Sequence, residues 1–268
     1  MSKKNENNVR NIVVLNTKGG VGKSIFTTQI APMFTYNGTS KINIYQIDDN
    51  NTIVLKSDFI NLFDIKINKF EDVIDEIELD KFQNNDVINI VDCGGGSDTK
   101  IILEYLKKSD FKNIEYYIPT NEDIEQVHNV NKTIELIRNF DKKAEITLVL
   151  NKVKNIDEVE EQFFAFFDKD DIYELDHKLK YEDINEFKFM LDTKVLGLIK
   201  NKEKTTLLDF FFKNEEIIAK VDELKNKVAN DKSKTQEEIK IEFKRLKQQI
   251  SNTKDAVQVA EYIKKNFS

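Results

Sequence analysis

A glycine-rich segment, NTKGGVGKSI, occupies positions 16–25 and directly follows the apolar, β-branched run NIVVL at positions 11–15. Such a run predicts a buried strand, and the residues from Lys23 to Tyr36 predict a helix. Three of the eight glycines of the chain lie in this segment. They allow backbone N–H groups to turn inward around a phosphate, at the positive end of the following helix. Strand, loop and helix together predict a P-loop and therefore an α/β nucleotide-binding domain.

The residues after the P-loop continue as alternating strands and helices. Apolar runs predict strands at 42–47, 87–91, 114–118 and 145–150, and amphipathic stretches predict helices at 70–77, 99–108 and 122–140. This alternation predicts right-handed βαβ units, a mainly parallel β-sheet flanked by helices, and ligand sites at the carboxyl ends of the strands. Pro32 predicts a kink or an early end of the first helix, because it removes one backbone donor.

The periodic signals weaken after position 154. We expect a helix over 156–167, edge strands over 172–175 and 186–190, a buried apolar segment over 206–212, and helix from 214 onward. No proline- or glycine-rich linker separates these stretches. We therefore predict a flexible lead (1–10), a P-loop domain (11–212) and a helical C-terminal region (213–268) that packs on or extends from that domain.

The composition excludes several classes of protein. A single cysteine, Cys93, cannot form an intrachain disulfide or a cysteine zinc site, and the two histidines, His128 and His177, are far apart in the sequence. No apolar stretch is long enough to cross a membrane, and the polar N-terminus is unlike a signal peptide. With 33% charged residues we expect a soluble, cytoplasmic protein. The net charge of −7 argues against general nucleic-acid coating but leaves room for a local basic patch.

Lys18 is not required by an ordinary P-loop, and with it the segment KGGVGKS resembles a known motif. It is similar to the deviant Walker A motif, KGGxGK[ST], of the ParA/MinD partition and positioning ATPases, and the chain is most like a ParA-type partition ATPase. The resemblance covers residues 11–152 and implies ATP and Mg²⁺ as cofactors. It also implies an ATP-dependent homodimer in which Lys18 reaches the phosphates of the partner subunit. There it would act like an arginine finger, a device worth about 10³–10⁵ in rate.

The second predicted strand ends in QIDDN, which matches the family pattern Asp-x-Asp-Pro-Gln only in part. By resemblance, Asp48 takes the place of the second aspartate, which orients or activates the attacking water. Gln46 replaces the first aspartate, and Asp49-Asn50 replaces Pro-Gln. Asp49 could share or take over the role, so this assignment stays open.

The third predicted strand leads into DCGGG, which is similar to a Walker B segment. Asp92 would hold Mg²⁺, through water, and Gly94 to Gly96 would form a switch loop near the γ-phosphate. Cys93 is expected to be a small packed residue, and a single cysteine argues against the related nitrogenase iron protein. Asn151, after a late strand, is the family's candidate for reading adenine. At Ile25 the family commonly has a Thr or Ser that touches the α-phosphate, so only the Ile25 backbone could do so here.

These assignments give the predicted site. The catalytic residues are Lys18, Lys23 and Asp48. The nucleotide-binding residues are Lys18, Gly19, Gly20, Val21, Gly22, Lys23, Ser24, Ile25 and Asn151. The metal-binding residues are Ser24 and Asp92, and the switch residues are Asp49, Gly94 and Gly95.

The C-terminal region carries an apolar helical stripe flanked by basic residues. Ile239, Phe243, Leu246 and Ile250 repeat at helical spacing. Lys240, Lys244, Arg245 and Lys247 lie beside the stripe. By resemblance they are candidates for non-specific DNA binding, although a packed face with a solvated rim has the same pattern. The apolar face of the last helix is thin, which disfavours a membrane-binding helix.

Three functions remain open at this stage. The first is a partition ATPase that dimerises on ATP, binds DNA, and hydrolyses ATP slowly when a DNA-bound adaptor protein stimulates it. The second is a MinD-like positioning ATPase acting at a membrane or cell pole. The third is an ATP-dependent dimer switch with negligible turnover, which the altered aspartate motif favours.

Overall fold

The computed structural model describes residues 9–47, 54–82, 86–108, 113–168, 172–173 and 175–268. Asp48 and Asp49, the predicted catalytic and switch aspartates, lie outside the described residues.

Within these residues, seven strands form one sheet in the order β3-β2-β4-β1-β5-β6-β7, and every neighbouring pair is parallel. The strands are β1 (Arg10–Val14), β2 (Lys41–Ile47), β3 (Ile60–Ile65), β4 (Val87–Cys93), β5 (Ile114–Thr120), β6 (Glu145–Val153) and β7 (Glu186–Leu191). The predicted parallel α/β fold is confirmed. β1 lies at the centre, so the loop after it opens at the middle of the carboxyl edge of the sheet.

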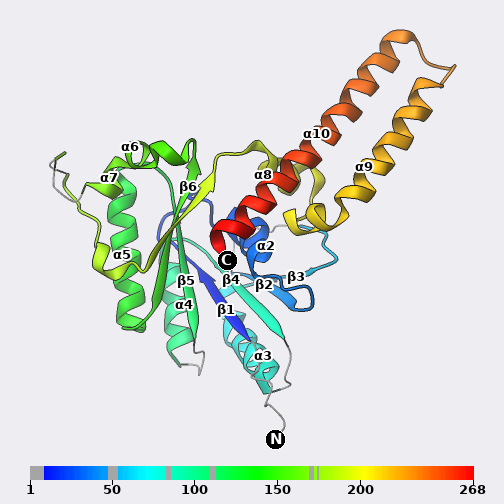
Figure 1. Ribbon diagram of the computed structural model, residues 1–268. Coiled ribbons are helices and arrows are strands. Elements are labelled where there is room, and N and C mark those ends of the chain that lie inside the picture. The colour runs from blue at the N-terminus through cyan, green and yellow to red at the C-terminus, as the bar shows by residue number, and fades with distance from the viewer. Residues whose placement is uncertain (1–8, 48–53, 83–85, 109–112, 169–171, 174) are drawn as a thin grey trace, which may run out of the picture.

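Helices cover both faces of the sheet (Figure 1). They are α1 (Lys23–Ile25), α2 (Ala31–Thr35), α3 (Phe70–Phe82), α4 (Ser97–Lys108), α5 (Glu125–Phe140), α6 (Val159–Gln162), α7 (Phe164–Phe167), α8 (Lys194–Leu198), α9 (Leu207–Ala229) and α10 (Gln236–Phe267). One buried cluster joins the sheet to α3, α4, α5 and the α6–α7 segment. The other joins its opposite face to α2, α8, the start of α9 and the end of α10.

The helix after the P-loop neither ends early nor stays regular at Pro32. A π-helical turn, Phe26–Ile30, joins α1 to α2, and Pro32 lies at the beginning of α2. The Ala31 amide donates to the Phe26 carbonyl, five residues back. This wider turn accommodates the missing proline donor without breaking the helix.

Three other local predictions differ from the structure. The sequence does not predict the edge strand β3. Residues 172 and 173, expected in an edge strand, instead form a turn and are largely exposed. The helix expected over 156–167 is divided into a 3₁₀ turn and two short helices, because Phe163 takes a non-helical conformation between α6 and α7.

Four asparagines form a hydrogen-bonded row across β1, β4, β2 and β3. The Asn89 amide donates to Asn11 at 3.2 Å, Asn43 donates to Asn89 at 3.4 Å, and Asn61 donates to Asn43 at 3.1 Å. Their Cα atoms are paired in register across the four strands. Asn11, Asn43 and Asn89 are buried. The row therefore fixes the register of these strands, because a shift in register would leave buried amides without hydrogen-bond partners.

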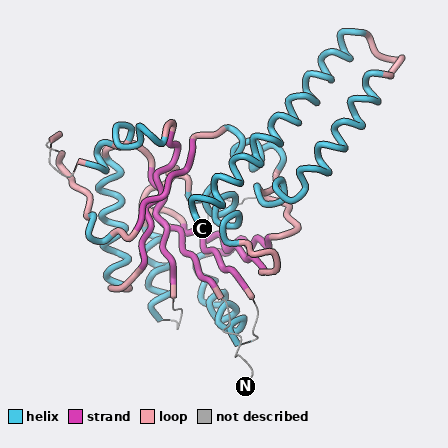
Figure 2. Tube along the Cα trace, in the orientation of Figure 1, coloured by secondary structure: helices cyan, strands magenta, loops and turns pink. Residues whose placement is uncertain are grey.

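Helices α9 and α10 form a long hairpin that projects from the body of the molecule (Figures 1 and 2). Thr235 and Glu238 form a capping box at the start of α10. At its other end α10 returns to the body, where Ala256, Ala260, Ile263 and Phe267 are buried. The predicted boundary at residue 213 falls inside α9, and the division into domains stays a prediction. In the part of the chain that is described, no helix is long and apolar enough to span a membrane.

Candidate functional site

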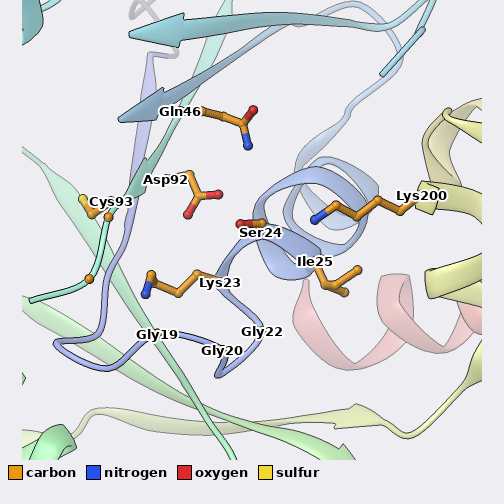
Figure 3. A pocket seen from close by; sticks show the side chains of 12 residues that line it. Gly19, Gly20, Gly22, Lys23, Ser24, Ile25, Gln46, Asp92, Cys93 and Lys200 are labelled. Carbon is orange, nitrogen blue, oxygen red and sulfur yellow. The ribbon is translucent and has the colours of Figure 1, made fainter. Parts of the chain in front are cut away.

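A cleft of about 320 Å³ opens at the carboxyl edge of the sheet beside the P-loop. Figure 3 shows the side chains around it. The lining residues are Gly19, Gly20, Gly22, Lys23, Ser24, Ile25, Gln46, Asp92, Cys93, Gly94, Gly95 and Lys200. The predicted P-loop and Walker B segments therefore meet in one cavity, although they lie far apart in the sequence.

The P-loop backbone adopts a conformation at position 22 that requires glycine. Gly22 has φ +103° and lies at the N-terminus of α1. A Cβ atom there would lie 2.3 Å from the Asn151 amide nitrogen. That amide donates a hydrogen bond to the Val21 carbonyl at 3.0 Å. Left-handed backbone and close approach thus both require glycine at this turn.

The Lys23 ammonium lies inside the loop. It donates to the carbonyl of Lys18 at 3.0 Å and to the carbonyl of Asn16 at 3.3 Å. The residue is only 9% exposed. These carbonyls hold the ammonium among the loop amides, where a phosphate would also be held, so the predicted phosphate-binding role of Lys23 fits the geometry.

Asp92 lies at the end of β4, next to the helix that follows the P-loop. Its carboxylate accepts a hydrogen bond from the Thr27 hydroxyl at 3.0 Å and is 6% exposed. Burial raises the pKa of Asp92, while hydrogen bonds from Thr27 and Ser24 and the charges of Lys23 and Lys200 act in the opposite direction. Because burial has the largest effect on this pKa, a further cation such as Mg²⁺ beside the carboxylate would stabilise its ionised form.

Gln46, at the end of β2, lines the cleft near Asp92, and its amide nitrogen, not its oxygen, is on the side of Asp92 and Ser24 (Figure 3). The residue is 4% exposed, and its Oε1 atom has no hydrogen-bond donor among the described residues. The Asp92 carboxylate and the Ser24 hydroxyl supply oxygen atoms on one side of the cleft, and Mg²⁺ prefers oxygen ligands. Ser24 and Asp92 would hold the ion, directly or through its waters.

The glycine triplet after Asp92 is attached to both neighbouring loops. The Gly94 amide donates to the Ile47 carbonyl and the Gly96 amide to the Thr17 carbonyl, each at 2.9 Å. The Thr99 hydroxyl donates to the Gly94 carbonyl at 3.0 Å. The triplet thus connects the end of β2 with the P-loop. Its predicted role as a switch loop stays a prediction.

Lys18, Val21 and Asn151 do not line the cleft. Val21 is buried, whereas the Lys18 side chain is exposed beside the loop. Asn151 is buried and donates its amide hydrogen bond to the Val21 carbonyl. The trans role of Lys18 and the adenine contact of Asn151 therefore stay predictions.

Lys200 is a lining residue that the sequence does not predict. It lies on a π-helical turn, Ile199–Glu203, that follows α8. The surrounding sequence, LIKNKEK, has no recognisable motif, and only the packing of this turn against the helix after the P-loop brings Lys200 to the cleft. No sequence signal that we recognise could have identified it.

Comparison with solved structures finds several similar proteins. The MinD cell division protein of Aquifex aeolicus is 19% identical, with a TM-score of 0.50 over 75% of this chain and 89% of that protein. The MinC:MinD complex of the same organism gives 18% identity and a TM-score of 0.50, over 75% and 88%. The ATP complex of a Cyanothece McdA variant gives 10% identity and a TM-score of 0.48, over 94% and 97%.

No protein-family model matches the sequence, and no curated protein does so either. The structural similarity to MinD nevertheless shows that the chain shares its fold, as the deviant Walker A resemblance implies. The comparison does not separate a ParA-like from a MinD-like protein.

Proposed function

We propose that the chain is a deviant Walker A ATPase that binds Mg²⁺–ATP in the P-loop cleft and dimerises on ATP. One observation supports this most strongly. Lys23, Ser24, Asp92 and the left-handed Gly22 meet in one cleft at the carboxyl edge of a MinD-like parallel sheet. Bound ATP would supply a terminal phosphate that water can attack. The protein's part is to hold the phosphates and to orient the water, for which Asp48 is the proposed residue.

The exposed position of Lys18 supports a dimeric site. Its carbonyl is engaged by Lys23, which fixes the backbone, while its side chain is exposed outside the cleft. A lysine in this position is free to reach the phosphates of a second copy. We propose that ATP binding joins two copies face to face and that Lys18 completes the site of the partner subunit.

The C-terminal hairpin supports partition over membrane positioning. Ala256, Ala260, Ile263 and Phe267, the apolar side of the final turns, are buried against the body and so are not presented to a lipid surface. Lys240, Lys244, Arg245 and Lys247 are exposed on the projecting part. We propose that this part of the hairpin binds DNA without sequence preference, and that a DNA-bound adaptor stimulates slow hydrolysis.

A nucleotide switch with negligible turnover is the second candidate. Gln46 favours it, because a neutral amide stands in the cleft where the family has an aspartate. An amide orients a metal-bound water but does not take up its proton.

ATP-dependent dimerisation tests the proposal directly. Wild type and the Lys18→Ala variant are measured by light scattering and phosphate release, with ATP and with ADP. We expect wild type to dimerise with ATP only. Lys18→Ala should bind ATP but lower turnover by roughly 10³-fold. Lys142→Ala, at an exposed lysine after α5, is the control. A wild type that stays monomeric at saturating ATP would refute the dimer, and the absence of phosphate release would favour the switch.

A further inference from the structure

Lys200 introduces a positive charge into the cleft from a distant part of the chain. The lysine lies on the turn after α8. The P-loop, in contrast, follows β1, and Asp92 lies at the end of β4. Figure 3 shows its side chain extending toward the helix that follows the P-loop, on the side of Ser24. It is half-buried. No carboxylate of the described residues forms an ion pair with it.

The surroundings of Lys200 are poor in compensating charge. Burial lowers its pKa, and the charge of Asp92 opposes that effect only in part. Gln46, which also lines this side of the cleft, is neutral, and its Oε1 atom has no donor in the described structure. A desolvated ammonium with little compensating charge is costly in the empty protein. That cost falls when an anion enters the cleft.

We propose that Lys200 is a phosphate-binding residue supplied in cis, which shares with Mg²⁺ the neutralisation of the terminal phosphates of a bound nucleoside triphosphate. The inference rests on the proposed function, because it assigns a further residue to the same nucleotide site. It differs from the roles of Lys23, which is held inside the loop, and of Lys18, which lies outside the cleft.

The neutral Gln46 leaves the positive charge of Lys200 uncompensated at the position where the resembled family has an acid. In a site with an acid at this position, the carboxylate would repel the phosphates and offset a neighbouring ammonium, so Mg²⁺ would carry more of the neutralisation. Here one acid is replaced by an amide, so Asp92 is the only carboxylate among the described lining residues. Lys200 adds a positive charge on the same side. Among the described lining residues, Lys23 and Lys200 therefore outnumber Asp92, and the affinity for a triphosphate should depend less on the metal.

Nucleotide affinity with and without Mg²⁺ tests this proposal. A fluorescent ATP analogue is titrated into wild type, Lys200→Met, Lys200→Arg and the control Lys202→Met, in Mg²⁺ and in EDTA. Lys202 lies on the same turn but is exposed. We expect Lys200→Met to weaken binding about tenfold in EDTA, the order of one charge-assisted hydrogen bond, and clearly less in Mg²⁺. Lys200→Arg should retain most of the affinity, and Lys202→Met should match wild type.

A second measurement uses the wild-type protein, so it does not depend on the folding of a variant. The lysines are labelled with an amine-reactive ester, with and without ATP in EDTA, and the sites are quantified by mass spectrometry. ATP should protect Lys200 but not Lys202. The proposal is overturned if a folded Lys200→Met binds like wild type in EDTA, or if its loss of affinity is equal in EDTA and Mg²⁺. If that variant does not fold, unprotected Lys200 overturns it.

The Lys23→Ala variant separates this inference from the proposed function. If wild type binds no nucleotide in either buffer, the proposed function fails and Lys200 has no role to assign. If wild type binds and Lys23→Ala does not, the nucleotide site stands. A wild-type-like Lys200→Met in that case removes only the inference.

Discussion

Gly22 shows how one backbone angle shapes the cleft. Gly22→Ala would introduce a Cβ at φ +103° and 2.3 Å from the Asn151 amide. We expect it to lower the free energy of unfolding by roughly 2 kcal/mol or more and to abolish nucleotide binding, because the loop must open to admit the methyl group. Urea denaturation and nucleotide titration measure the two effects.

Gly197→Ala is the matched control for this substitution. Gly197 lies in α8, and a Cβ atom added there would have no neighbouring atom within 4 Å. A helical alanine at this position should be neutral or stabilising by up to about 1 kcal/mol. Equal effects of the two substitutions would show that the turn at Gly22 is not constrained.

The ionisation of Asp92 should make the free energy of unfolding depend on pH. Burial raises the pKa of this carboxyl in the folded protein. The folded state therefore binds the proton more tightly than the unfolded state, and the ionised group costs stability as the pH rises above its unfolded pKa. Asp92→Asn should make the nucleotide-free protein more stable at pH 8, with a smaller gain at pH 5, while it weakens Mg²⁺-dependent nucleotide binding. Urea denaturation at both pH values measures the gain. A gain that grows toward acidic pH would contradict this reasoning.

At the level of the elements, the sequence predicts those with a strong apolar pattern. The buried runs at β1, β2, β4, β5 and β6 are recognisable, because a central parallel strand is apolar on both faces. β3 escapes prediction because it is an edge strand: only Ile60 is buried, and Phe63 is 38% exposed. At 172–175 the reverse happens, since the apolar residues predict a strand but Ile172 is 74% exposed.

The asparagine row makes a testable claim about these strands. Asn89 is 0% exposed and has amide partners on both sides. Asn89→Ala would leave the Asn11 oxygen and the Asn43 amide with one partner fewer each. We expect a loss of about 2–4 kcal/mol in the free energy of unfolding, measured in urea. Asn61→Ala, at the exposed end of the row, should cost less than about 1 kcal/mol, because water can replace its amide. A loss below about 1 kcal/mol at both positions would mean that the row does not stabilise the sheet.

At the scale of the whole molecule, the candidate site is predictable only where it is local. Gly19 to Ser24 form one contiguous motif, and Asp92 ends an obvious strand, so both can be found from the sequence. Lys200 reaches the cleft from a turn after β7 through tertiary packing, which leaves no pattern in one sequence. The hairpin is predictable as helix, but its projecting shape is not, because helical periodicity says which residues share a face and not what that face meets.

The projecting hairpin leads to the last prediction. Lys240, Lys244 and Lys247 recur at helical spacing along one exposed face of α10, and Lys254 continues the series toward the body. Lys247 also packs over the Phe243 ring, 5.3 Å from its centre, so part of this face is held in place. A regular row of ammonium groups on a projecting helix suits the evenly spaced phosphates of DNA.

Charge reversal on this face should weaken DNA binding and make it less sensitive to salt. The double variant Lys240→Glu/Lys244→Glu is compared with Lys142→Glu/Lys143→Glu, which makes the same charge change at an exposed turn after α5. Co-sedimentation with a random-sequence duplex is measured in ATP across a salt series. Each lost phosphate contact should reduce the slope of log affinity against log salt by roughly 0.9, so the hairpin variant should show a slope shallower by nearly 2 and the control should not. If the two variants bind equally and with equal slopes, the DNA surface lies elsewhere, and the lysines of α10 form only the solvated side of a packed hairpin.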